Sequence, residues 1–350
     1  MQYYDLKFNK KIKHNLLWQG LAHLPHALLL TGPSGVGKRD FAERLAALLL
    51  CEAATSDMEA CGQCVACRWL AAGNHPDFRR ITPGEDKETE TEEAKNEKSS
   101  EKAKKQGADI IRIDQIRELE DFVFAGSHRQ ANRVVLVTDA EAMNSAAANS
   151  LLKLLEEPPS SVYFILISSR KKNLLPTLRS RCRIIPFTQP DRQAAADWLG
   201  CASLEKQATR YLDLAGGAPL RVVQWKNEGQ LAAIDTLLES LLTARNDPIA
   251  LAASWDAMLK GNASFRLENL VEGVQRWLFD LTLERMSGKI HYHRGWPRFK
   301  NIEMLAPAAL IAAWHAINTF RRSSRHPLNQ LLFLESLAFH YLRALRPQTP

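Results

Sequence analysis

The chain has 350 residues, of which 45% are hydrophobic and 24% charged, and its formal net charge is +7. This length is typical of two or three domains, and the composition is that of a globular protein rather than a disordered one. No run of about 18 apolar residues occurs, which argues against a membrane-spanning helix. The N-terminus, MQYYDLKFNKK, has no apolar core of a secretion signal, so we expect a cytoplasmic protein.

Short apolar runs alternate with helical patterns in the first half of the chain. Residues 26–31 (HALLLT) read as a buried strand, followed by a glycine-rich turn and a helical pattern over 40–50. Further buried strands are expected at 133–138, 162–168 and 184–187, with a helix over 146–155 that ends before Pro158 and Pro159. Strands that alternate with helices predict a parallel sheet covered on both faces.

Two other regions have a different character. Residues 84–107 contain 14 charged side chains and no aromatic or large aliphatic one, which predicts a disordered or frayed-helical insert. Strand patterns end near Pro190, and we expect only helices beyond it, at 194–199, 204–214, 220–226, 234–242, 267–285, 307–320 and 329–345.

The turn after the first strand fits the phosphate-binding pattern G-x-x-x-x-G-K. Its glycines let backbone N–H groups surround a phosphate at a helix N-terminus, and the lysine reaches the outer phosphates. Arg39 follows, where Ser or Thr normally supplies a hydroxyl to Mg²⁺. We therefore regard the turn as a degenerate nucleotide site whose occupancy by ATP or ADP stays open, and we do not expect Mg²⁺ in it; the site comprises Gly32, Pro33, Ser34, Gly35, Val36, Gly37, Lys38 and Arg39.

The strand at 133–138 leads into Asp139, the position from which P-loop NTPases hold Mg²⁺. Active AAA+ ATPases usually have a Glu after this Asp, and that Glu orients the attacking water. In this chain Ala140 occupies the position. Glu141 is one residue further and should point elsewhere, because side chains alternate along a strand. Arg39 and Ala140 affect the same reaction, so we expect little or no ATP hydrolysis by this chain.

Four of the six cysteines fall close together, as Cys51, Cys61, Cys64 and Cys67. Four thiolates can complete a tetrahedral zinc site, and the pattern leaves no open position for catalysis. We predict a structural zinc site; free thiols are the alternative. His75 nearby is a weaker ligand candidate.

Arg181 lies in the tripeptide Ser180-Arg181-Cys182, which follows LLPTLR. An arginine fixed at such a place can act as an arginine finger on the phosphates of a neighbouring subunit, because its charge is permanent and planar. The tripeptide alone is a weak signal, and a surface arginine is the alternative.

These motifs occur in an order that is recognisable. HALLLTGPSGVGK, the cysteine cluster, GNHPD, IDQIREL, NSLLKLLEEPP and LRSRC together resemble the clamp-loader subunits of bacterial DNA polymerase III, delta-prime and gamma/tau. The resemblance is dense over residues 20–187. Gamma/tau-like members have GKT or GKS and an Asp-Glu pair, whereas Gly37-Lys38-Arg39 and Asp139-Ala140 place this chain with the delta-prime type.

The resemblance implies three domains. These are an AAA+ P-loop domain over 1–188 with an embedded zinc module at about 51–67, a small three-helix lid over 189–229, and a helical collar over 230–350 that joins subunits into a hetero-pentamer. It also implies that Arg181 acts in trans on ATP held by an adjacent gamma/tau subunit. Arg221 in GGAPLRVVQW stands where active relatives have a nucleotide-sensing arginine of the lid.

The implied function is DNA replication within the DNA polymerase III holoenzyme, a nucleotidyltransferase complex. The chain would be a stator with little or no ATPase or polymerase activity of its own, working with gamma/tau and delta subunits to load the sliding clamp on primed DNA. One alternative is an active gamma-like ATPase, which would require turnover by the isolated chain.

A second alternative is a DNA-binding module. A group of basic residues without an intervening acid could contact phosphates, although a solvated loop is the simpler interpretation; the group is Arg285, Lys289, Arg294, Arg298 and Lys300.

Overall fold

The computed structural model describes residues 10–17, 20–55, 57–84, 110–125, 132–170, 173–200, 208–244, 246–324 and 329–346. The chain forms two compact units, Met1–Pro190 and Asp191–Pro350. Most of the expected charged insert, residues 85–107, lies outside the described residues, as does Cys201.

The first unit is built on a parallel sheet. Its strands are β1 (Ala27–Thr31), β2 (Phe78–Ile81), β3 (Arg133–Val137), β4 (Val162–Ser168) and β5 (Arg183–Pro186), in the spatial order β2-β3-β4-β1-β5. Every pair of neighbours is parallel. The four predicted strands are confirmed, whereas β2 was not predicted, because its sequence FRRI exposes two arginines at the sheet edge instead of an apolar run.

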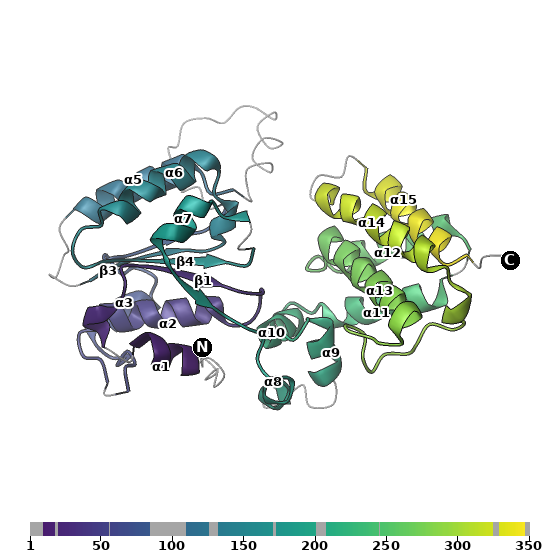
Figure 1. Cartoon of the computed structure of the whole chain (residues 1–350), viewed down its shortest axis with the longest axis horizontal. Helices are drawn as coiled ribbons and strands as arrows, with labels where there is room; N and C mark the ends of the chain where they lie inside the picture. The colour runs from purple at the N-terminus through teal and green to yellow at the C-terminus, as the bar shows by residue number, and fades with distance from the viewer. Residues whose placement is uncertain are drawn as a thin grey trace. The chain divides into compact units, whose positions relative to one another are not determined.

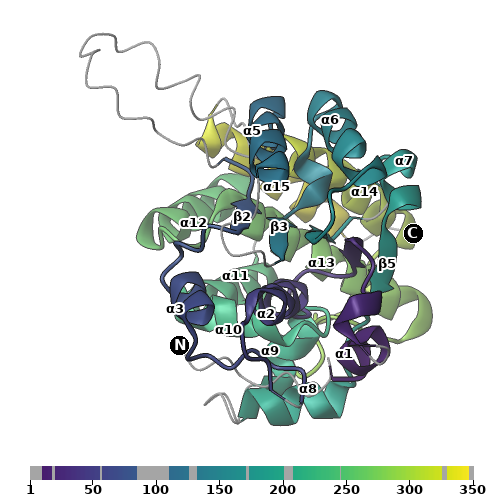
Figure 2. The same cartoon turned by 90° about the vertical axis from the view of Figure 1, so that its left-hand side faces the viewer.

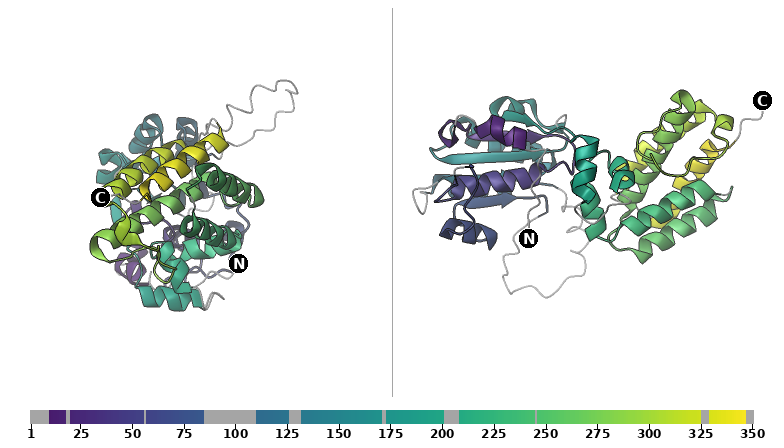
Figure 3. Two further views of the ribbon diagram at one scale, coloured as in Figure 1. Left: turned by 90° about the vertical axis from the view of Figure 1, so that its right-hand side faces the viewer. Right: turned by 90° about the horizontal axis from the view of Figure 1, so that it is seen from below.

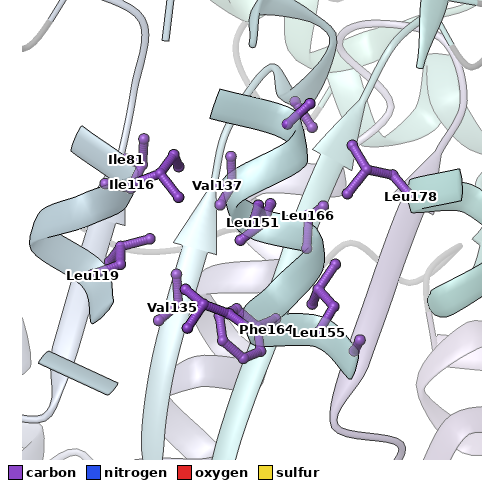
Figure 4. Close-up of a cluster of buried hydrophobic side chains, with 14 of the residues drawn as sticks. Ile81, Ile116, Leu119, Val135, Val137, Leu151, Leu155, Phe164, Leu166 and Leu178 are labelled. Carbon is purple, nitrogen blue, oxygen red and sulfur yellow. The ribbon is translucent and has the colours of Figure 1, made fainter. Parts of the chain in front are cut away.

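Helices cover both faces of this sheet, as the alternating pattern predicts (Figures 1 and 2). α5 (Ile113–Phe124) and α6 (Ser145–Glu156) cover one face, and α2 (Lys38–Leu50) covers the other. Figure 4 shows the core between α5, α6 and the sheet, where Phe164 and Val135 meet Leu151 and Leu155. The shorter helices of this unit are α1 (Lys10–Leu17), η2 (Leu21–His23), α3 (Val65–Ala71), η3 (Ala140–Ala142) and α7 (Pro176–Arg181).

The described part of the second unit contains helices and no strand. α8 (Arg192–Leu199), α9 (Ala208–Leu214) and α10 (Pro219–Asn227) pack on one another. The remaining helices lie side by side in green to yellow (Figure 3) and are α11 (Leu231–Thr243), α12 (Pro248–Gly261), α13 (Leu267–Ser287), η6 (Ile302–Met304), α14 (Pro307–Ser323) and α15 (Gln330–Ala344). The all-helical second half is confirmed, and its division into lid and collar stays a prediction. In the described residues, none of these helices combines the length and apolarity needed to span a bilayer.

Gly32 shows why the end of β1 requires glycine. Its φ is +151°, and a Cβ placed there would lie 2.1 Å from the carbonyl oxygen of Phe187. The close approach is fixed from two sides, since the N–H of Gly32 donates to Ser168 O (3.3 Å) and the N–H of Phe187 donates to Thr31 O (2.7 Å). The P-loop is therefore attached to both neighbouring strands.

We expect Gly32→Ala to lower the free energy of unfolding by about 2 kcal/mol or more, because backbone rather than a flexible side chain must move. Gly73→Ala is the matched control: Gly73 also has positive φ (+78°), but nothing lies within 4 Å of an added Cβ. Urea unfolding of both variants measures the difference. Equal losses would contradict the steric explanation.

Candidate functional site

The P-loop joins β1 to α2 and has the shape that its sequence predicts. Gly35 and Gly37 adopt positive φ (+80° and +93°), and α2 begins at Lys38. The Lys38 ammonium, however, donates to carbonyl oxygens of the loop itself, at 2.7 Å to Gly32 and 2.6 Å to Pro33, and to Ser169 Oγ at 3.2 Å. A phosphate that used this lysine would have to replace those bonds.

Lys38 is almost completely buried, at 5% exposure. Burial lowers the pKa of its ammonium to about 8, and the nearby carboxylates of Glu141 and Asp139 oppose that shift only in part. The lysine is thus a poorly solvated cation whose acidic neighbours lie at the end of β3.

Arg39 turns away from the loop. Its side chain is 59% exposed, and Nε donates to Glu43 Oε1 at 3.0 Å along α2. Arg80 from β2 reaches the same carboxylate oxygen at 2.9 Å. The residue that replaces the usual hydroxyl therefore belongs to a surface ion-pair cluster and offers no oxygen to a metal ion.

The segment after β3 corrects one expectation. The strand ends at Val137, Asp139 takes a left-handed conformation (φ +49°), and residues 140–142 form a turn of 3₁₀-helix, so alternation no longer decides where Glu141 points. Instead, Glu141 Oε1 accepts the N–H groups of Ser169 (3.0 Å) and Arg170 (3.1 Å) after β4. Glu141 organises this turn, while the buried Ala140 occupies the place of a water-orienting Glu.

The surroundings of the Asp139 carboxyl also shift its pKa. Partial desolvation raises its pKa above the usual range, and the neighbouring Glu141 carboxylate raises it further. The positively charged Lys38, Arg39 and Arg170 counteract these effects only partly. Acidic and basic groups thus already compensate one another around the P-loop.

The four cysteines of the predicted zinc module converge. Their Sγ atoms all lie within 4.8 Å of one another, with 3.9 Å between Cys51 and Cys64 and 4.0 Å between Cys61 and Cys67. Zn–S bonds of about 2.3 Å in a tetrahedron place sulfurs about 3.8 Å apart, so this set fits a zinc ion. Cys51 ends α2, and Cys64 caps the N-terminus of α3.

Backbone N–H groups point at the sulfurs, as a cluster of thiolates requires. Cys61 N donates to Cys51 Sγ at 3.3 Å, and Cys64 N donates to Cys61 Sγ at 3.3 Å. Backbone hydrogen bonds from Gln63 and Cys64 lower the pKa of Cys61 to about 6, whereas burial raises the pKa of Cys67 to about 12. His75 is not in the cluster: its Nδ1 accepts the N–H of Asp77 at 3.0 Å.

A groove of about 910 Å³ adjoins this module. It is lined by α2, by the turn at 73–76, by Cys67 and by both exposed arginines of β2, Arg79 and Arg80. Sequence pattern does not predict this groove, because the polar edge strand β2 has no apolar run.

Arg181 ends α7 and is held there by two contacts. Its guanidinium pairs with Glu156 at the end of α6 and donates to Thr177 O at 3.3 Å. The motifs LLKLLEEPP and LRSRC, distant in sequence, therefore meet at this point. The next residue, Cys182, is buried and anchors the turn into β5.

The sheet register separates Arg181 from the P-loop. Arg183 pairs with Leu28 near the start of β1, whereas the P-loop follows Thr31 at the end of β1. Strands in a parallel sheet run the same way, so Arg181 lies at the N-terminal ends of the strands and the P-loop at their C-terminal ends. At least about 10 Å of strand separates them. The P-loop, the cysteine cluster and Arg181 are thus separate sites within the first unit.

Arg221 lies in the second unit and is engaged there. Its guanidinium pairs with Glu272 on α13 at 2.5 Å, and Arg276 pairs with the other oxygen of Glu272 at 2.6 Å. Arg276 also donates to Leu214 O at 2.7 Å. Arg221 thus joins α10 to α13, and a sensing role toward nucleotide stays a prediction.

Residues 9–191 match the family model described as "DNA polymerase III, delta subunit". A DNA polymerase III subunit delta-prime from Pseudomonas aeruginosa is 38% identical over 251 residues, which cover 69% of this chain and 70% of that protein. The chain belongs to the DNA polymerase III delta-prime family. The Escherichia coli member is 31% identical over 218 residues, covering 62% of this chain and 59% of that protein.

Among solved structures, a gamma subunit-related protein of DNA polymerase III from Thermotoga maritima is similar over 97% of this chain and 99% of its own, with 17% identity and a TM-score of 0.46. The delta-prime family membership bears out the resemblance drawn from the motifs. It also makes DNA replication the process to which the chain belongs.

We expect the purified chain to hold close to one zinc ion, and Cys64→Ser to lose most of it because only three thiolates remain. Metal analysis by mass spectrometry and the visible spectrum after cobalt substitution measure this. Cys182→Ala, which removes a buried cysteine outside the cluster, should keep the metal. Zinc content unaffected by Cys64→Ser would contradict a four-cysteine site.

The lowered pKa of Lys38 predicts that the free energy of unfolding depends on pH. Its folded-state pKa of about 8 lies below the ordinary value of 10.5, so between these pH values the unfolded chain binds more protons and stability rises with pH. Relative to Lys38→Met, wild-type unfolding free energy should therefore increase by about 1–3 kcal/mol from pH 7 to pH 10. Lys153→Met, at an exposed position on α6, should show no such trend in urea unfolding. A flat difference for Lys38→Met would refute the lowered pKa.

Proposed function

We propose that this chain is a stator of the clamp loader and activates ATP hydrolysis in trans. In this role it joins gamma/tau and delta subunits in a hetero-pentamer that places the sliding clamp on primed DNA. Arg181 supplies the arginine finger to ATP held by a neighbouring gamma/tau subunit. The proposal begins from membership of the delta-prime family.

The observation that carries this proposal is the placement of Arg181. It lies at the end of the sheet opposite its own P-loop, so it is not placed to act on a phosphate held by that loop. Arg181 keeps 35% of its side chain exposed while Glu156 and Thr177 hold it. A preorganised cation at a surface costs little to position against the developing charge of a phosphoryl group.

The state of the P-loop supports the stator role. Arg39 faces solvent and offers no hydroxyl to a metal ion, and Ala140 provides no water-orienting carboxylate. These two replacements affect different parts of the machinery for hydrolysis, which argues against the alternative of an active gamma-like ATPase. Measurable turnover by the isolated chain would restore that alternative.

Arg181→Ala should leave assembly of the complex intact and lower its DNA-stimulated ATPase, by ~10³-fold at the one site that it serves. The loss in steady-state rate is smaller where other sites keep turning over, so single-turnover hydrolysis is the sharper measurement. Arg183→Ala, two residues further along and also exposed, is the matched control and should retain the rate.

An ATPase rate of the Arg181→Ala complex equal to that of wild type would refute the trans role. Failure of the variant to assemble, checked by gel filtration with the partner subunits, would assign Arg181 to the interface instead.

A further inference from the structure

The loop at residues 288–300, between α13 and η6, has an organisation that a solvated connection does not need. The buried carboxylate of Asp280 on α13 accepts the N–H groups of His291 (3.0 Å), Tyr292 (2.9 Å) and His293 (2.7 Å). The His293 ring contacts the same carboxylate through Nδ1 at 2.7 Å. One acidic side chain thus fixes the backbone of the loop from inside.

Aromatic packing fixes the part of the loop around Trp296. Trp296 is buried, with its ring 6.1 Å from Tyr211 and the Arg210 guanidinium over its face. His293 packs edge-on against Trp277 at 5.0 Å. The loop therefore has one ordered conformation without regular secondary structure, and a ligand that binds it has little ordering entropy to overcome.

The outer surface of this loop is basic. No acidic residue occurs between Glu284 and Glu303. Lys289, Arg294 and Lys300 are exposed, and Arg294 Nε donates to Ile290 O at 3.0 Å, which holds its guanidinium on the loop. In the part of the chain that the structure describes, neither Lys289 nor Lys300 forms an ion pair. Arg298 of the same loop pairs with Glu284 at 3.5 Å, whereas Lys289 and Lys300 are presented on an ordered backbone without an ion-pair partner among the described residues.

Aromatic rings lie beside these cations. Phe279 on α13 is 37% exposed, and its ring lies 6.3 Å from His291 and 5.8 Å from Tyr292. His291 is exposed and stands edge-on to Tyr292 at 4.6 Å. Exposed rings next to fixed cations are the combination that binds single strands, in which base faces are available for stacking and phosphates for ion pairing.

We propose that the 288–300 loop, together with Phe279, binds single-stranded DNA. Lys289, Arg294 and Lys300 contact phosphates, and Phe279 with His291 stacks on unpaired bases. This site is on the second unit and does not depend on the P-loop or on Arg181, so it adds a DNA contact that the stator role does not include.

The test uses the full purified chain without partner subunits, and fluorescence anisotropy of a labelled oligothymidine at about 50 to about 200 mM NaCl. Lys289→Ala/Arg294→Ala/Lys300→Ala should weaken binding at least about tenfold and reduce the slope of log affinity against log salt by about 2, since each lost phosphate contact removes ~0.7. The charge-conserving triple variant Lys289→Arg/Arg294→Lys/Lys300→Arg should bind the oligonucleotide like wild type.

The matched control removes three exposed cations elsewhere on the same unit, as Lys260→Ala/Arg266→Ala/Arg343→Ala. It should bind like wild type. Equal losses in both triple variants would overturn the proposal in favour of general charge attraction. Unchanged thermal unfolding of both variants shows that the fold is retained.

Phe279→Ala distinguishes single strands from other polyanions. It should weaken oligothymidine binding several-fold without changing the salt slope, because stacking releases no counterions. A duplex of the same length should bind more weakly than the single strand. Duplex binding equal to that of the single strand, or polyglutamate competing as well as oligothymidine, would overturn the assignment to single-stranded DNA.

Discussion

The parallel pairing of β1 with β4 and β5 is the constraint that sets where the P-loop and Arg181 lie. It places the ends of β1, β3 and β4 at one sheet edge, where the P-loop, Asp139 and the Ser169–Arg170 turn meet. It places the start of β5, and with it Arg181, at the opposite edge. A single register therefore separates the P-loop from the exposed Arg181.

Charge compensation stabilises the shape of the P-loop. The loop's own carbonyls, Ser169 and the acidic groups of Asp139 and Glu141 satisfy Lys38, and Glu43 takes up Arg39. Because a buried ammonium without partners would be strongly destabilising, these contacts stabilise the fold around Lys38. In the second unit, the single carboxylate of Asp280 likewise accepts several hydrogen bonds and orders a loop whose outer face is basic.

Much of the architecture followed from sequence pattern. Apolar runs located β1, β3, β4 and β5 because buried parallel strands are continuous in Val, Ile and Leu. The pattern missed β2, since an edge strand carries polar side chains, and it missed α12, whose apolar residues do not form a clear stripe. The cysteine spacing predicted one cluster, and the four sulfurs do converge.

The sequence by itself determined the family, the P-loop, the replacements at Arg39 and Ala140, and the cysteine cluster, because these depend on residue types at short fixed spacings. The tertiary structure alone decided contacts between distant segments. It turned Glu141 toward the backbone of Ser169, paired Arg181 with Glu156, and joined Arg221 to Glu272. It also placed the buried carboxylate of Asp280 against the backbone of residues 291–293, a contact that is not apparent from the charge pattern. Such partners are set by strand register and helix packing, which no local pattern encodes.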